Sequence, residues 1–90
     1  MRARTRGDVA LFAEVVRVVR HSARIPAHLR IEEDSRLVED LAIDSLDLVG
    51  VILALQDHFD VVIEEDAVPN LCRVSDLAAY LKEHMNSSRP

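Results

Sequence analysis

The chain has 90 residues, a formal net charge of −5, 49% apolar residues and only 3% aromatic ones. This size fits one small domain with an aliphatic core, and no apolar stretch is long enough to span a membrane. A single cysteine excludes an internal disulfide and is consistent with a reducing cytoplasm, which is the expected location.

The first predicted helix runs from about Asp8 to His21, with Asp8 as its cap and apolar residues at helical spacing. It lies in a basic part of the chain, because residues 1–30 carry seven arginines and two acidic residues. Residues 31–90 carry four basic and fourteen acidic residues. The acidic main body disfavours binding to nucleic-acid phosphates. The start of the chain also lacks the apolar core of a signal peptide.

No sustained period runs through residues 22–43, and Pro26 would interrupt a helix there. A connection of this length is unusual in a small domain and is often functional. Six aliphatic side chains are available to fix it to the core: Ile25, Leu29, Ile31, Leu37, Leu41 and Ile43. We therefore expect an ordered crossing segment and not a flexible linker.

The second helix is predicted from Ser45 to Phe59 and is apolar over much of its circumference. Ser45 is expected both to cap this helix and to keep its hydroxyl exposed. Gly50 is unusual, since glycine inside a helix costs about 1 kcal/mol relative to alanine. It is either a tolerated local weakness or a point of close approach by a partner or prosthetic group.

The rest of the chain predicts a loop, a short helix and a last helix. The β-branched residues 61–63 have no second strand to pair with, so they favour an inward-packing loop. A short third helix is expected from Glu64 to about Asn70, and the last helix from Ser75 or just before it to about Met85. The sequence thus indicates an all-α fold, a small four-helix bundle of three main helices and a short one, with a long first loop. The expected organisation is a flexible basic N-terminus in residues 1–7, a domain in residues 8–85 and a flexible tail in residues 86–90.

No arrangement of side chains suggests catalysis or metal binding by the chain alone. Cys72 lies beside Leu71 and Val74 and is interpreted as a small buried apolar residue. The histidines lack metal-ligand spacing and are interpreted as surface or helix-end residues: His21, His28, His58 and His84. The chain is therefore not expected to be an enzyme, and no metal site is predicted.

Residues 41–49, with the sequence LAIDSLDLV, resemble the phosphopantetheine attachment motif of acyl carrier proteins, usually written Leu-Gly-x-Asp-Ser-Leu. Residues 54–59 are similar to the acidic helix end that phenylalanine closes in that family. Residues 74–77 look like the start of its last helix. The resemblance covers most of residues 9–84, and the helix order, length and acidity of the chain agree with it.

The resemblance implies that a separate transferase uses coenzyme A to attach 4′-phosphopantetheine covalently to Ser45. The thiol of this arm would then carry acyl groups as thioesters between partner enzymes of fatty-acid, polyketide or related biosynthesis. Asp44 resembles the family's acid that helps the transferase bind and hold its metal. The implied partners are this transferase, an acyl-loading ligase or synthase and downstream acyl-transfer enzymes, met by a monomer that needs no membrane. The residues expected to face the arm or partners are Asp44, Leu46, Asp47, Val49, Gly50, Leu53 and Asp57.

Three departures from the family pattern indicate a specialised carrier. Ala42 stands where most carriers have glycine, so the turn must avoid a positive φ or accept strain. Gly50 and Gln56 replace positions that are commonly glutamate in fatty-acid carriers, which leaves Asp47 and Asp57 on the acidic face. Two alternatives remain open at this point. One is a carrier for an activated amino acid or other cargo, and the other is an unmodified helical adaptor in which Ser45 is only a cap.

Overall fold

Three α-helices and one short 3-10 helix make up the regular structure of residues 6–87, the part described in a computed structural model. They are α1 (Arg6–Ser22), α2 (Ser45–Phe59), η1 (Val68–Asn70) and α3 (Val74–Ser87). Within these residues the only β-type pairing is one isolated bridge between Arg36 and Arg73. The predicted all-α fold with a long first loop is confirmed.

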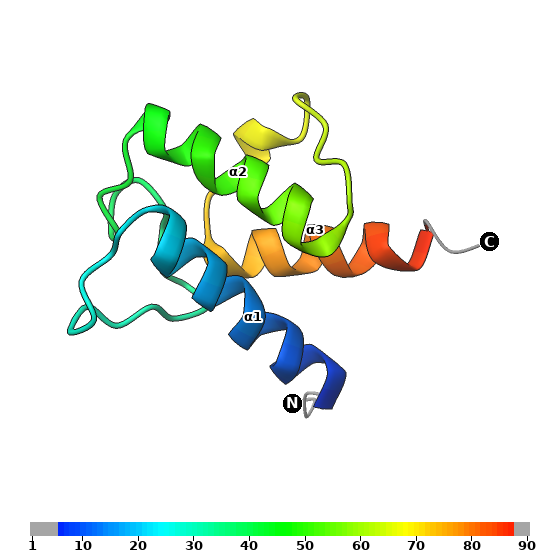
Figure 1. The fold of residues 1–90 in the computed structure, drawn as a ribbon, viewed down its shortest axis with the longest axis horizontal. Helices are drawn as coiled ribbons and strands as arrows, with labels where there is room; N and C mark the ends of the chain where they lie inside the picture. Colours follow the sequence, from blue (N-terminus) through cyan, green and yellow to red (C-terminus); the bar gives the residue numbers. More distant parts are fainter. Residues whose placement is uncertain (1–5, 88–90) are drawn as a thin grey trace.

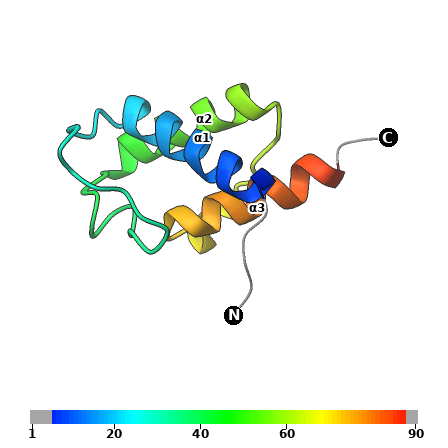
Figure 2. The same cartoon turned by 90° about the horizontal axis from the view of Figure 1, so that it is seen from below.

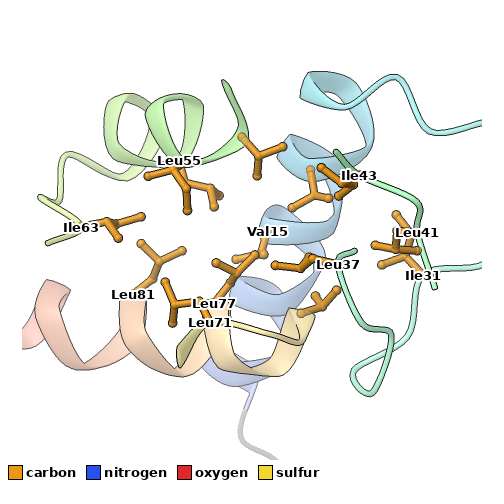
Figure 3. Packing of buried hydrophobic residues seen from close by; sticks show 14 of the residues in the cluster. Val15, Ile31, Leu37, Leu41, Ile43, Leu55, Ile63, Leu71, Leu77 and Leu81 are labelled. Atoms are coloured by element: carbon orange, nitrogen blue, oxygen red, sulfur yellow. The ribbon is translucent and has the colours of Figure 1, made fainter. Parts of the chain in front are cut away.

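Helix α1 packs against both α2 and α3, and the end of α1 lies at the same end of the molecule as the start of α2 (Figure 1, Figure 2). The core between them is aliphatic. In Figure 3, Leu55 of α2 points toward Leu77 and Leu81 of α3, and Val15 of α1 lies near the centre. The largest fully buried side chains come from all three helices and the first loop: Leu37, Leu55, Leu77, Leu81, Val15, Val19, Val51 and Val74.

The helix bounds follow the sequence pattern with small differences at the ends. Helix α2 has the predicted bounds, whereas α1 begins at Arg6, so Asp8 lies inside the helix and does not cap it. Helix α3 begins at Val74, just before Ser75 as predicted, and extends two residues past the predicted end, to Ser87. The segments predicted to be flexible are residues 1–7 and 86–90. Residues 1–5 and 88–90 lie outside the described residues, whereas residues 6–7 and 86–87 belong to α1 and α3.

The first long connection is an ordered segment, as predicted. Five of its six aliphatic anchors are buried, and Leu29 is half-buried against the core. Backbone hydrogen bonds also fix it to the start of α3: the Leu37 N–H donates to the Cys72 carbonyl at 2.9 Å, and the Val74 N–H donates to the Ser35 carbonyl at 3.1 Å. Buried side chains and satisfied backbone groups together hold this long loop in place.

The connection between α2 and α3 is less helical than predicted. Val61 and Ile63 are buried in a loop, as expected, while Val62 points outward. The predicted helix from Glu64 is only a turn followed by η1. Pro69 explains the difference, because its ring would clash with the carbonyl four residues earlier in an α-helix that ran through it.

Cys72 is exposed, so its interpretation as a buried apolar residue is wrong. Its neighbours Leu71 and Val74 take the buried positions of this segment. The backbone of Cys72 is held by Leu37, and its own N–H donates to a carboxylate oxygen of Asp76 at 3.0 Å. These contacts fix the backbone with the side chain directed outward.

Candidate functional site at the start of α2

Asp44 caps α2, and Ser45 is the first helical residue. The Asp44 backbone is extended, with φ −80° and ψ 174°, and its Oδ1 accepts from the Asp47 N–H at 2.8 Å. The Leu48 N–H donates to the Asp44 carbonyl at 2.8 Å, which is the first hydrogen bond of the helix. The predicted cap at Ser45 is therefore wrong by one residue, since the capping residue itself must be non-helical.

Because Asp44 is the cap, the Ser45 hydroxyl is not needed for capping. The side chain is exposed, as predicted. The N–H groups of Ser45 and Leu46 belong to the first helical turn, where no intrahelical carbonyl is available to them. Such a position combines a solvent-facing hydroxyl with free N–H groups and the positive end of the helix dipole.

The turn before Asp44 contains a left-handed alanine. Ala42 has φ 57°, whereas the residues on both sides, Leu41 and Ile43, are buried in the core. The Ile43 N–H donates to the Leu37 carbonyl at 3.1 Å. Because the side chains of Leu41 and Ile43 both point into the core, the backbone turns tightly at Ala42. Of the two options given by the sequence, the turn has the positive φ and accepts its strain.

We expect Ala42→Gly to raise the free energy of unfolding by about 0.5–1 kcal/mol. Glycine adopts positive φ without a Cβ clash, although its more flexible unfolded state offsets part of the gain. Chemical denaturation followed by circular dichroism measures the change. The matched control is Ala13→Gly on the exposed side of α1, where the same substitution should destabilise the helix by about 0.5–1 kcal/mol. A loss of stability at both positions would contradict the strain at Ala42.

Three apolar residues of α2 that were expected to face the arm or partners lie on the surface. Leu46 is 79% exposed, Val49 55% and Leu53 57%, and these three residues are called the apolar strip below. They follow one another at intervals of three and four residues, so they share one helix face. Ordinary core packing is thereby excluded for all three residues.

Gly50 lies within this face, four residues after Leu46 and three before Leu53. It is exposed, and a Cβ built on it meets nothing within 4 Å. No φ in the left-handed range is recorded for a described glycine, so its backbone is ordinary helix. Nothing inside the fold therefore requires glycine at this position.

Charged residues frame the apolar strip without entering it. Asp47 and Asp57 are exposed near the two ends of α2, and no charged residue occurs in residues 48–56. A groove of about 310 Å³ borders the strip between α2 and the following connection, with Val49, Leu53 and Ile63 among its lining residues. An exposed hydroxyl at the start of α2 is thus followed along the helix by an exposed apolar surface.

Gln56 has a structural role that sequence reasoning missed. Its Oε1 accepts from the Ile63 N–H at 2.8 Å in a half-buried position. Its carbonyl accepts from the N–H of Asp60, a left-handed C-cap with φ 56°, and from that of Val61 at 3.2 Å. The side chain and backbone of Gln56 together fix the chain reversal after α2, so the hydrogen bonds of this residue are made within the protein. An alternation of polar and apolar residues cannot reveal such a bond.

Comparison with known proteins decides the family. Residues 9–81 match the family model described as the phosphopantetheine attachment site. This chain belongs to the acyl carrier protein family. It is 35% identical over 74 residues to the acyl carrier protein of Sulfurovum sp. (strain NBC37-1), covering 82% of this chain and 97% of that protein. It is 33% identical over 76 residues to that of Brachyspira hyodysenteriae, covering 84% and 97%. The acyl carrier protein of Chlamydia trachomatis serovar L2 is 41% identical over 56 residues, covering 62% and 73%.

The cofactor of this acyl carrier protein is covalently attached 4′-phosphopantetheine, as its family membership implies. The start of α2 fits such a group on three counts. Ser45 offers an exposed hydroxyl, the first helical turn offers N–H groups to a phosphate, and the apolar strip lies directly beyond. The Asp44 carboxylate is directed back to the Asp47 N–H.

The other candidate groups that the structure of this acyl carrier protein describes do not come together as a second site. Among residues 6–87, no group of three or more His, Cys, Asp or Glu side chains is placed to hold a metal ion. His58 lies 2.9 Å from Glu14 and joins α2 to α1, while His84 stacks on Tyr80. No described helix has the length and apolar character needed to cross a bilayer.

Proposed function

We propose that Ser45 carries the 4′-phosphopantetheine arm and that this protein presents thioester-bound acyl groups to enzymes of fatty-acid, polyketide or related biosynthesis. The observation that supports this most strongly is the exposed Ser45 at the first helical position, with the capping task taken by Asp44. A serine hydroxyl that neither caps nor packs remains available to a modifying enzyme. The protein acts as a carrier and not as a catalyst, and we propose a cytoplasmic monomer.

The residues of this chain have three tasks in the proposed attachment. The Ser45 Oγ would attack the phosphate of the arm in coenzyme A, so that a phosphodiester forms while the pyrophosphate bond breaks and adenosine 3′,5′-bisphosphate leaves, and a base of the transferase would take the serine proton. The N–H groups of the first helical turn stabilise that phosphate, and the helix dipole adds to the attraction. The arm supplies the thiol on which acyl groups are held, and the apolar strip provides a surface beside it.

Intact-protein mass spectrometry tests the proposal directly. The recombinant apo-protein is incubated with coenzyme A, Mg²⁺ and a broad-specificity phosphopantetheinyl transferase. We expect a single addition of about 340 Da, the mass of one arm. No addition under conditions in which a known carrier domain is fully modified would reject the proposed function.

Asp44→Asn should separate the capping role of Asp44 from its charge. Asparagine caps helices about as well as aspartate, so the free energy of unfolding should change by less than about 0.5 kcal/mol. The rate of arm attachment should fall at least about tenfold, since an amide is a poor ligand for the transferase metal that the family's acid helps to hold. Mass spectrometry of samples quenched at successive times gives the rate of arm attachment, and denaturation followed by circular dichroism gives the free energy of unfolding. An unchanged rate would show that Asp44 serves the cap alone.

A further inference from the structure

The second half of α1 and the residues that follow it form a basic part of an otherwise acidic protein. Residues 15–30 contain four arginines and no aspartate or glutamate, a formal charge of +4 within a total of −5, so the other residues carry −9. Arg17, Arg20 and Arg24 follow one another at intervals of three and four residues and are called the basic band below. Attachment of an arm to Ser45 gives this band no task.

The basic band lies on the solvent side of α1. Val15 and Val19 are fully buried and define the inner side of this helix. Arg17 is two residues from each of them, which places it on the opposite side at 3.6 residues per turn. The Arg17 side chain is 74% exposed, and Arg24 is also exposed. Because α1 packs against α2 through its inner side, the band is directed away from α2 and is separate from the apolar strip.

The charge of the band is only partly neutralised within the protein. The Arg20 Nη1 donates to the Pro26 carbonyl at 2.8 Å, a contact that positions the guanidinium without a counter-charge. Arg24 makes no side-chain hydrogen bond or ion pair with another residue of the described chain. Arg17 pairs with Glu14 at 2.8 Å, which leaves most of its five N–H donors available to a partner.

Arg24 occupies a backbone position that favours glycine. Its φ is 55°, in the left-handed region, just after the end of α1. The Ile25 N–H donates to the Arg20 carbonyl at 3.0 Å, which is the bond of a helix end that commonly has glycine in this place. Arg20 and His21 already supply basic groups at the negative end of the helix dipole. The arginine is therefore present despite backbone strain, and folding does not explain it.

The size and surroundings of the band indicate an acidic protein surface as its partner. Arg17 and Arg24 are seven residues apart, about 10 Å along a helix, which matches a few carboxylates and not an extended polyanion. The charge of −9 on the other residues repels nucleic acid and anionic lipid. No large apolar side chain of residues 10–37 is exposed, so the band lacks the apolar anchor of a membrane-surface helix. Guanidinium groups pair with carboxylates through two parallel hydrogen bonds.

We propose that the basic band is a second docking surface of this carrier and binds a carboxylate-rich surface of a partner protein. The inference goes beyond the proposed function, because it concerns another helix and does not require an arm on Ser45. Asp47 and Asp57 attract basic groups to α2, whereas the band attracts acidic groups to α1. The two surfaces thus select partners of opposite charge, and a protein bound to α1 leaves the start of α2 accessible.

Titration with a synthetic acidic peptide tests this docking surface. The peptide is a helix with glutamates at intervals of three and four residues, and the same peptide with glutamines is the matched control probe. At low salt the glutamate peptide should shift the amide NMR signals of residues 17–24. Its Kd should rise about tenfold between about 50 and 500 mM salt, because salt screens exposed charges. Arg17→Gln and Arg24→Gly should each raise Kd about threefold, and the double variant about tenfold.

Arg73→Gln is the matched control variant. Arg73 is exposed and lies outside the band, so the loss of the same charge there should leave Kd unchanged. The melting temperature of Arg24→Gly should be at or above that of the wild type, because glycine suits the left-handed position. Weaker binding by this variant therefore cannot result from unfolding.

Three results would overturn the proposal. The first is an absence of shifts at the band, or an equal Kd for the wild type and the double variant; the mass assay on Ser45 is independent of this outcome. The second is binding to phosphatidylcholine vesicles with about 30% phosphatidylserine that the double variant abolishes, which would assign the band to a membrane. The third is a wild-type dimer that the double variant dissociates in sedimentation, which would assign it to the acidic surface of a second copy.

Discussion

Ser45→Ala is expected to abolish the mass gain of about 340 Da completely, because no other hydroxyl occupies the first position of α2. The same substitution should change the free energy of unfolding by less than about 0.5 kcal/mol, as is usual for an exposed side chain without structural contacts. Mass spectrometry and chemical denaturation of one preparation give both values. The combination of total functional loss with unchanged stability is the signature of an attachment site.

The structure makes this substitution decisive between a carrier and an unmodified adaptor. If Ser45 were a helix cap, its replacement by alanine would cost about 1 kcal/mol. Because Asp44 is the cap, Asp44→Ala should show that cost instead. Ser35→Ala serves as the control for the mass assay, since Ser35 lies in the crossing segment and its Oγ accepts from the Glu32 N–H. A mass gain retained in Ser45→Ala would place the arm elsewhere.

Leu55→Ala should destabilise the protein by about 2–5 kcal/mol, the range for large-to-small substitutions in a packed core. Leu55 is fully buried in α2 and points toward Leu77 and Leu81 of α3 (Figure 3). Small domains have about 5–15 kcal/mol of total stability, so this one substitution removes a large part of it. Urea denaturation followed by circular dichroism measures the loss.

Leu53→Ala provides the matched control for this prediction on the same helix. Leu53 is 57% exposed, so the same atoms are removed without leaving a cavity, and the loss should stay within about 0.5 kcal/mol. Comparable losses at positions 53 and 55 would contradict the assignment of the two faces of α2. The pair therefore tests directly which side of this helix belongs to the core.

The sequence predicted the parts of the fold that depend on periodicity. Helix α2 has a long apolar pattern, so its bounds and its buried face around Leu55 could be derived from spacing alone. The crossing segment was recognised because its aliphatic residues needed a core to pack against. The exposed hydroxyl of Ser45 followed from its place at a helix start.

The features that the sequence did not predict are set by single contacts. Asp44 and Ser45 are both good capping residues and adjacent, so composition cannot decide which one has the extended backbone. The bond from Gln56 to the Ile63 N–H depends on a loop reversal that follows the helix. The outward side chain of Cys72 depends on pairing with a distant segment. Local pattern carries no information about such tertiary hydrogen bonds.

The backbone pairing of Leu37 with Cys72 has a consequence for the size of the smallest working unit. Leu37 accepts from the Ile43 N–H, and Ile43 directly precedes the cap of α2, so the turn before Ser45 is supported by a segment that follows it in the chain. A fragment ending before Cys72 would retain the whole attachment motif and all of α2. It would lose this support at their junction, so we expect such a fragment to hold Ser45 less firmly at the start of α2 than the complete bundle does.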